Sequence, residues 1–233
     1  MASVADDIVA VGPNEYEKTY VHDVYDRISS HFSNTRYKAW PKVKKFVDRG
    51  LQPDSSENIR EDILWIDVGC GNGKNFPEIR ERAMPTAFGF DRCKNLVDIA
   101  AAKTQGRVQL MVADAMHIPF RSNIFEGSIC IAVLHHITTV ERRVRLIREC
   151  ARVLSPDAYL LFYSWAKEQD KVQSDTQDVL VPWKPRQCDE IEGVMTENRF
   201  CHLYEQNEVE GLIDTHCGDV LRVVQSYYDR ENW

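Results

Sequence analysis

The fold of this chain is decided by residues 64–73, which read LWIDVGCGNG. An apolar run leads to an acid, Asp67, and three glycines then follow at every second position. Glycine has no Cβ, so it adopts positive φ angles and lets a ligand lie directly against the main chain. The stretch therefore predicts a buried strand that runs into a tight, ligand-binding turn. Its spacing differs from the dinucleotide pattern Gly-x-Gly-x-x-Gly.

Three further apolar runs follow, and each ends in polar residues. Residues 87–91 end in Asp91, residues 108–115 end in Asp114 and an alanine, and residues 129–136 end in two histidines. A carboxylate at Asp91 can accept hydrogen bonds from both hydroxyls of a ribose. Each acid is also compatible with a helix N-cap or a loop charge, so the cofactor interpretation depends on all the runs together.

Together these runs resemble the class I S-adenosylmethionine (SAM) methyltransferases. The resemblance implies SAM as the cofactor and an α/β, Rossmann-like fold. In that fold a mostly parallel twisted sheet of order 3-2-1-4-5-(7)-6 carries helices on both faces. The cofactor-binding residues that it implies are Asp67, Gly69, Cys70, Gly71, Gly73, Asp91, Arg92, Asp114, Ala115, Met116, Ala132 and Val133.

The composition suits a single intracellular domain. With 233 residues the chain is long enough for one α/β core. Its seven cysteines include no Cys-x-x-Cys pair, which predicts reduced thiols and no metal site. The sequence has no apolar run of about 18 residues and no signal-peptide pattern. We therefore expect no membrane association and a cytoplasmic location, with a nuclear pool as the alternative.

The charge is distributed unevenly. A net charge of −7 argues against a nucleic-acid partner, but residues 27–49 form a basic segment with interleaved aromatic side chains. Five arginines also lie between Arg142 and Arg152 on a predicted amphipathic helix. Basic helix faces are usually only solvated surface, so contact with RNA and simple solvation both remain open.

The chain is predicted to have a mobile N-terminus at 1–14 and one methyltransferase domain at 15–233. Within that domain we expect N-terminal helices and a linker at 15–62 and a SAM-binding core at 63–165. A substrate-side insertion at 166–200 and a C-terminal helix and strand at 201–233 would follow.

Periodicity predicts several elements within these segments. Helices are expected at 15–32, 41–49, 141–154 and 208–216, and 155–157 are expected to form a turn. The fifth and sixth strands are predicted at 159–165 and 220–228. The chain stops where the antiparallel seventh strand of this fold would begin. Either it is truncated or the sheet is completed differently.

The flanks of the glycine turn carry a more specific resemblance. Residues 20–28 (YVHDVYDRI) and 31–41 (HFSNTRYKAWP) resemble the opening of the tRNA wobble-uridine carboxymethyl methyltransferases. These enzymes share their methyltransferase domain with the AlkB-homologue tRNA enzymes. The chain departs from the family at Ala39, at residues 155–158 and in a short loop after Trp183. The resemblance continues through residues 68–74, 131–136, 141–144, 177–183, 199–204 and 227–233, so it spans nearly the whole chain.

This resemblance implies methyl transfer from SAM to the carboxylate of 5-carboxymethyluridine at the anticodon wobble position. The acceptor is already an anion, so the site must orient and desolvate it rather than remove a proton. Arg36 matches the family arginine that holds one carboxylate oxygen, and His136 matches its companion; these are the predicted catalytic residues. For His135 the favoured alternative is a packed or structurally bonded histidine, and each aromatic residue is equally compatible with core packing. The predicted substrate-binding residues are Arg27, His135, Arg199, His202, Tyr204 and Trp183, with Trp165 as a further stacking candidate.

The resemblance also implies two macromolecular partners. One is the tRNA anticodon stem-loop, and the other is a small zinc-binding activator subunit. The strand from Val108 to Ala113 would be a free sheet edge and would pair with that subunit. Two rival interpretations are a small-molecule carboxyl methyltransferase on the same fold and a non-catalytic, regulatory SAM-binding protein.

Overall fold

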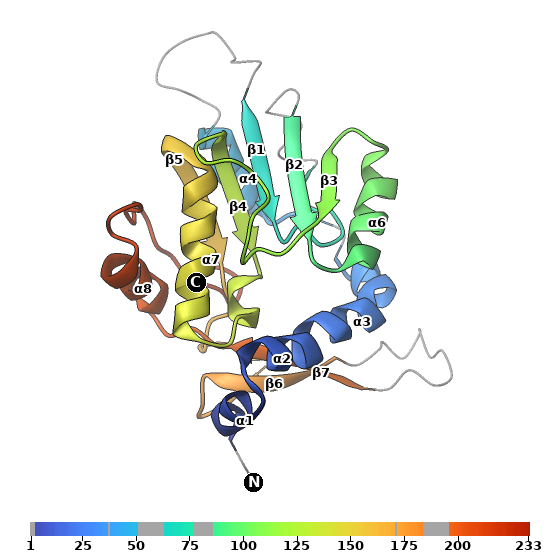
Figure 1. Ribbon diagram of the computed structural model, residues 1–233, viewed down its shortest axis with the longest axis vertical. Helices are drawn as coiled ribbons and strands as arrows, with labels where there is room; N and C mark the ends of the chain where they lie inside the picture. Colours follow the sequence, from blue (N-terminus) through green and yellow to red (C-terminus); the bar gives the residue numbers. More distant parts are fainter. Residues whose placement is uncertain (1–2, 37, 51–62, 77–85, 171, 184–195) are drawn as a thin grey trace.

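The computed structural model describes residues 3–36, 38–50, 63–76, 86–170, 172–183 and 196–233. Its centre is a five-stranded parallel sheet in the order β3-β2-β1-β4-β5 (Figure 1). This order confirms the predicted arrangement of the first five strands. The strands are β1 (Leu64–Val68), β2 (Thr86–Asp91), β3 (Gln109–Val112), β4 (Phe125–Ile131) and β5 (Leu154–Tyr163).

Helices cover both faces of this sheet, and the N-terminal helices lie across the carboxyl ends of its strands (Figure 1). A glycine turn, a 3-10 turn and several short loops connect the strands to the helices at that end. The helical elements are α1 (Val4–Val11), α2 (Pro13–Glu17), the π-helical turn η1 (Lys18–His22), α3 (Asp23–Asn34), α4 (Pro41–Gly50), α6 (Lys94–Thr104), the 3-10 turn η2 (Leu134–His136), α7 (Val140–Val153) and α8 (Glu208–His216).

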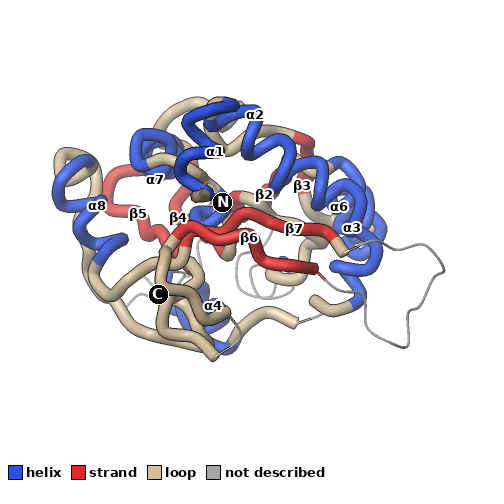
Figure 2. Tube along the Cα trace, turned by 90° about the horizontal axis from the view of Figure 1, so that it is seen from below, coloured by secondary structure: helices blue, strands red, loops and turns tan. Residues whose placement is uncertain are grey.

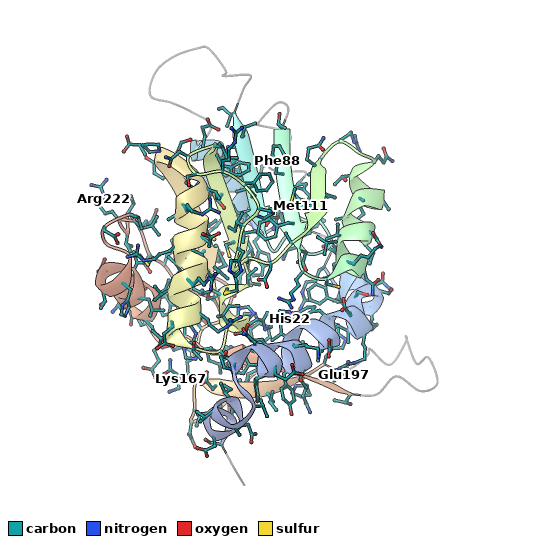
Figure 3. The ribbon with its side chains drawn as sticks, in the orientation of Figure 1. His22, Phe88, Met111, Lys167, Glu197 and Arg222 are labelled. Atoms are coloured by element: carbon teal, nitrogen blue, oxygen red, sulfur yellow. The ribbon has the colours of Figure 1, made fainter. Side chains whose placement is uncertain are left out.

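The two faces of the sheet form separate apolar clusters, because alternate strand residues point to opposite sides. On one side Ile66 and Phe90 pack with side chains of α7 and α8. Phe88 and Met111, both labelled in Figure 3, belong to this side. On the other side Trp65 packs with side chains of α4. This double coverage accounts for the nearly continuous apolar runs in the sequence.

Within the N-terminal segment Val4–Val11 form helix α1, and the mobility expected for residues 1–14 stays a prediction. Ser3 and Asp6 make a capping box, in which Ser3 Oγ accepts from Asp6 N at 3.2 Å and Asp6 Oδ2 accepts from Ser3 N at 3.0 Å. Ile8 is buried in a cluster with Tyr16 and Phe200. The cap and this apolar contact together stabilise α1.

The helix predicted at 15–32 begins earlier, ends later and is irregular. It runs as α2, η1 and α3 from Pro13 to Asn34, with a π-helical turn in the middle. π-Helical turns inside α-helices are rare and occur often at functional sites. This one ends at His22, whose side chain Figure 3 places between the N-terminal helices and the carboxyl ends of the strands.

A second, two-stranded sheet forms part of the predicted insertion. Strands β6 (Asp178–Trp183) and β7 (Glu197–His202) pair in an antiparallel manner. Figure 2 shows this pair crossing the same end of the molecule as α1 and α2. The apolar residues 179–183 of the insertion therefore belong to a strand that borders the cavity at the carboxyl ends of the main sheet.

The C-terminal part differs from the prediction. Residues 221–228 form no strand, and Val224 is 71 % exposed. The chain instead turns back on itself, so that Ser164 and Trp233 exchange two main-chain hydrogen bonds of 2.9 Å each. A strand forms only where its main chain finds a partner edge, which apolar alternation alone cannot guarantee.

Two smaller differences occur around β5. The strand already begins at Leu154 and includes residues 155–157, which were expected to form a turn. Its pairing with β4 shifts register between Phe125 and Gly127, and Asp157 has a φ of 64°. In the described parts of the chain, no helix combines the length and apolarity needed to cross a membrane.

Candidate active site

A cavity of about 1210 Å³ lies between the carboxyl ends of the parallel strands, the N-terminal helices and β6–β7. It brings together residues from both ends of the sequence. Of the predicted residues, those that line it are Arg36, Gly69, Cys70, Gly71, Asp91, Arg92, Asp114, Ala115, Met116, Ala132, Val133, His135, His136, Trp183 and Arg199, joined by Trp165.

The glycine turn after β1 has the backbone conformation that its sequence predicts. Gly69 has a φ of 69° and Gly71 a φ of 53°. A Cβ on Gly69 would lie 2.3 Å from Cγ2 of Val133, so this position also needs glycine for packing. A Cβ on Gly71 would meet nothing within 4 Å. Gly69 is therefore required by packing within the protein, whereas Gly71 borders open space in the cavity.

Two acids are held at the wall of the cavity by main-chain amides. Asp91 Oδ2 accepts from Gly71 N and Asp91 Oδ1 from Cys93 N, both at 2.9 Å. Burial raises the pKa of Asp91, and these amide hydrogen bonds partly oppose that effect. Asp114 accepts from Met116 N at 2.9 Å and pairs with Arg92. Each Asp91 oxygen retains a lone pair for a hydroxyl group of a ligand.

Asp67 lies buried beneath the glycine turn, outside the cavity lining. Its Oδ2 accepts from Asn75 Nδ2 at 3.2 Å, and its Oδ1 is buried with no partner among the described residues. Burial raises the pKa of Asp67 to about 7. Lys74 has its pKa lowered to about 8 by burial and by the charge of Arg36. An acid with a free oxygen at this place suits a ligand that carries an ammonium group.

Ala132, directly after β4, has a φ of 63°, a backbone conformation that residues other than glycine rarely adopt. Its amide donates to Tyr163 O at 2.8 Å, which holds this strained residue in place. Strained backbone of this kind concentrates at binding sites. It directs the following turn, with His135 and His136, into the cavity.

The opposite part of the cavity centres on a three-residue network. The Tyr25 hydroxyl lies 2.9 Å from His136 Nε2, and Arg199 Nη1 donates to the same hydroxyl at 3.3 Å. The other ring nitrogen of His136, Nδ1, lies 2.7 Å from Phe200 O. A carbonyl oxygen can only accept, so Nδ1 carries the proton and Nε2 accepts from Tyr25.

His136 is consequently a neutral, fully bonded side chain. Burial, with the nearby Arg199 cation, lowers its pKa to about 3. The pKa of His135 also lies well below its ordinary value, chiefly because of burial. His135 accepts from Trp165 N at 3.3 Å and stacks on the ring of Trp165. These histidines therefore serve as neutral parts of the wall rather than as cations.

His135, His136 and Cys201 bring possible metal-ligand atoms within 4.8 Å of one another. Both nitrogens of His136 are already committed to hydrogen bonds, and burial raises the pKa of the Cys201 thiol to about 12. A zinc site needs thiolate and free imidazole nitrogens. The arrangement therefore favours a hydrogen-bonded network over a metal centre.

Arg36 lies at the edge of the same region. Its guanidinium is 5.3 Å from the ring centroid of Phe32 and 6.0 Å from that of Trp183. Asn72, in the glycine turn, donates from Nδ2 to Arg36 O at 2.7 Å. This hydrogen bond ties the segment that carries Arg36 directly to the predicted cofactor turn.

Comparison with known proteins agrees with this geometry. A methyltransferase domain family matches residues 66–162. The tRNA (carboxymethyluridine(34)-5-O)-methyltransferase of Schizosaccharomyces pombe is 35% identical over 240 residues, which cover 94% of this chain and 96% of that protein. The chain belongs to this methyltransferase family. The alkbh8 tRNA (carboxymethyluridine(34)-5-O)-methyltransferase of Xenopus tropicalis is 30% identical over 275 residues, covering 96% of this chain but only 41% of that protein.

The fold is also shared with solved structures. A SAM-dependent methyltransferase from Methanosarcina mazei superposes with a TM-score of 0.56 at 19% identity, covering 76% of this chain and 84% of that one. This likeness supports the fold of the methyltransferase family, which the strand order had already indicated.

Some predicted residues of the tRNA (carboxymethyluridine(34)-5-O)-methyltransferase motifs do not line the cavity. Gly73, the third glycine of the turn, packs against Phe76 and Ala100 rather than facing it. Arg27 pairs with Glu197 at the surface, with Nε 2.6 Å from Oε1.

Two more such residues belong to β7 and the segment after it. His202 lies between Asp178 and Glu208, at 2.6 and 2.7 Å. The Tyr204 hydroxyl donates to Leu134 O at 3.4 Å. Residues three apart on a strand face opposite sides, so Arg199 and His202 cannot both point into the cavity.

The structure also brings forward residues that sequence reasoning missed. Tyr25 occupies the centre of the network, although the sequence places it only within a predicted helix and assigns it no role. Asn72 was quoted within the glycine turn, but no role followed from its position. The only sequence signal for Tyr25 was that it lies within the resembling segment 20–28.

Proposed function

We propose that this chain is a SAM-dependent tRNA methyltransferase that esterifies the carboxylate of 5-carboxymethyluridine at the wobble position. The observation that carries the proposal is that one cavity holds two different sites. The glycine turn with Asp91 forms one end, and a cationic, aromatic pocket with Arg36 and Arg199 forms the other. The family relationship supports the same reaction, because its named members are tRNA carboxymethyluridine methyltransferases.

The residues of the first end fit SAM. Asp91 has lone pairs for the two ribose hydroxyls, and Gly71 leaves open space where a ligand can lie against the main chain. Asp67 lies buried beneath the turn, and its Oδ1, which has no partner among the described residues, would attract the ammonium group of a ligand bound at the turn. Asp114 and Met116 would border the adenine. The chemistry that SAM supplies when bound is an electrophilic methyl group on a sulfonium.

The residues of the second end suit a carboxylate acceptor. Methylation of an anion needs no general base, and the neutral His136, whose Nε2 already accepts a hydrogen bond, is not arranged as one. The chain's task is to hold the carboxylate in line and to exclude water. Arginine suits this task because it stays charged and presents planar donors. In this proposal His136 is a positioning residue that fixes the Tyr25 hydroxyl.

The RNA would enter with its wobble base unpaired. Trp165 and Trp183 line the cavity and offer aromatic faces on which a base can stack. The basic segment 27–49 contains the second half of α3 and Arg36, which follows the C-cap of that helix. We assign this segment to contacts with the anticodon stem-loop.

The activator subunit would bind at the edge of the main sheet. β3 pairs only with β2 in the described sheet, and Val112 at its end is 52 % exposed. A free edge with an exposed apolar residue can accept another strand and is an association hazard otherwise. We therefore retain the small zinc-binding activator as a proposed partner. The domain division and the cytoplasmic location also remain proposals.

The decisive experiment measures transfer of labelled methyl from SAM to tRNA that lacks the wobble methyl ester. The chain would be assayed alone and with its candidate activator, and nucleosides would then be analysed. Label in an alkali-labile uridine ester is expected. Arg36→Ala should lose this label while SAM affinity is retained. SAM binding without label in RNA, in either preparation, would favour a small-molecule or regulatory function.

A further inference from the structure

Arg199 stands out among the arginines that the structure describes, because its charge is buried and none of the described residues supplies a counter-charge. Its side chain is only 4 % exposed. No carboxylate of the described residues pairs with it, and its buried Nε has no hydrogen-bond partner there. An isolated charge is costly to remove from water, so such a group needs a compensating partner.

The surroundings of Arg199 are aromatic. Its guanidinium carbon lies 4.9 Å from the ring centroid of Trp183, 5.7 Å from that of Trp165 and 5.9 Å from that of Tyr25. Cation–π contacts stabilise the charge in part and keep the planar group in one orientation. These three rings provide no negative charge, so the described surroundings of Arg199 do not neutralise its guanidinium.

A buried arginine elsewhere in the chain shows the usual arrangement. Arg143 is 3 % exposed and donates to Ile137 O at 2.9 Å and Thr138 O at 3.0 Å. It also lies 3.5 Å from Asp178 Oδ1. Arg143 is thus fully compensated within the protein. Because the described residues offer Arg199 no such counter-charge, its guanidinium can pair with an anion on a ligand bound in the cavity.

Arg199 also lies where a bound ligand can reach it. It lines the cavity that contains the glycine turn, and its Nη1 is anchored by the Tyr25 hydroxyl, which His136 orients in turn. A side chain fixed in this way is pre-organised for a planar, charged ligand.

We infer that Arg199 binds the acceptor carboxylate itself, and that its uncompensated buried charge makes the site select a carboxylate over the corresponding amide. This inference rests on the proposed function. A carboxylate neutralises the guanidinium, whereas an amide leaves the charge buried and unpaired. Arg36, at the edge of the pocket, then provides a second contact.

The test compares two anticodon stem-loop RNAs, one with 5-carboxymethyluridine and one with 5-carbamoylmethyluridine at the wobble position. Binding is measured with S-adenosylhomocysteine present, so that no transfer occurs. The protein is expected to bind the acid about 10- to 100-fold more tightly than the amide. Arg199→Met should reduce this ratio to about one. Arg222→Met, which changes an exposed arginine that does not line the cavity and that Figure 3 shows on the side of α8, should leave it unchanged.

Thermal unfolding distinguishes a binding role from a structural one. Removing an uncompensated buried charge should leave the Tm of the ligand-free Arg199→Met chain unchanged or higher. Arg143→Met, which removes a compensated charge, should lower it. A Tm for Arg199→Met as low as that of Arg143→Met would mark a structural cation and overturn the inference.

Arg199→Lys gives a second variant that retains a charge. It should keep part of the preference for the acid, and an uncharged Arg199→Gln should not. An undiminished acid-to-amide ratio in Arg199→Gln would show that the carboxylate is bound elsewhere. The wild-type methyl-transfer assay is independent of these variants, so failure there would instead count against the proposed function.

Discussion

The hydroxyl of Tyr25 lies 2.9 Å from Nε2 of His136 and joins helix α3 to the 3-10 turn η2 that follows β4. Through Arg199 Nη1 the same hydroxyl also reaches β7. One side-chain oxygen therefore connects three elements that together enclose the acceptor end of the cavity.

Tyr25→Phe should disrupt this connection without removing the ring. His136 Nε2 would lose its donor, which costs about 1–3 kcal/mol for a buried polar atom. We expect methyl transfer to fall by about tenfold or more, with SAM affinity unchanged, in single-turnover and binding assays.

Tyr16→Phe is the matched control for this variant. The Tyr16 hydroxyl is buried with no partner among the described residues, so its removal should leave stability unchanged or raise it. Equal loss of activity in both variants would contradict a specific role for Tyr25.

The first two glycines of the turn should respond differently to alanine. Gly69→Ala would meet Val133 and should lower the free energy of unfolding by about 2–4 kcal/mol from crowding and positive φ. Gly71→Ala has space in the ligand-free chain and should mainly weaken SAM binding. Gly106→Ala, at an exposed positive φ of 72°, controls for backbone strain alone. Denaturant unfolding measures the stability of each variant, and SAM titration measures its affinity for the cofactor. Equal SAM affinity for Gly71→Ala and Gly106→Ala would remove Gly71 from the cofactor site.

Binding of SAM should depend on pH through Asp67. Burial raises the pKa of Asp67 from 3.8 to about 7, so its contribution to stability is fully present below pH 3.8 and is lost as the pH rises through about 7. The ammonium group of bound SAM would instead favour the ionised form of Asp67. SAM affinity should therefore rise between pH 5.5 and 7, where an α-amino group stays protonated.

The slope should approach at most about tenfold per pH unit, and isothermal titration calorimetry would measure it. Asp67→Asn should remove the slope. A pH-dependence that persists in this variant would assign the titration to another group. Lys74, with a pKa of about 8, stays charged over this range.

The free edge of β3 should be the activator's binding site. Val112→Lys places a charge on this edge, which disfavours pairing with another strand. We expect it to weaken co-purification with the candidate activator by about tenfold or more. Val224→Lys, at a more exposed valine outside the sheet, should have no effect. Equal co-purification of both variants with the activator would exclude the β3 edge.

Sequence reasoning succeeded where the information is local. The parallel sheet follows from alternating apolar runs and helices, its strand order was implied by the family resemblance, and the positive φ angles of Gly69 and Gly71 follow from the residues themselves. It failed for the strand expected at 220–228, because strand formation depends on a partner edge that the segment does not find.

The acceptor pocket shows the same limit. Arg199 and His202 belong to one short motif, but the pleat of β7 sends them to opposite sides, and only Arg199 lines the cavity. Tyr25 gains its role from Arg199, which is 174 positions away in the sequence. No pattern within one helix could reveal that contact.

That separation has a consequence for the order in which the site can arise during synthesis. The glycine turn needs only the parallel strands, whereas the acceptor pocket joins α3 to β7 and must wait for the late insertion to leave the ribosome. A nascent chain that has reached β5 would thus be able to hold a nucleoside before it can discriminate any RNA. Ribosome-stalled chains of increasing length should first bind the nucleoside and only later discriminate between RNAs.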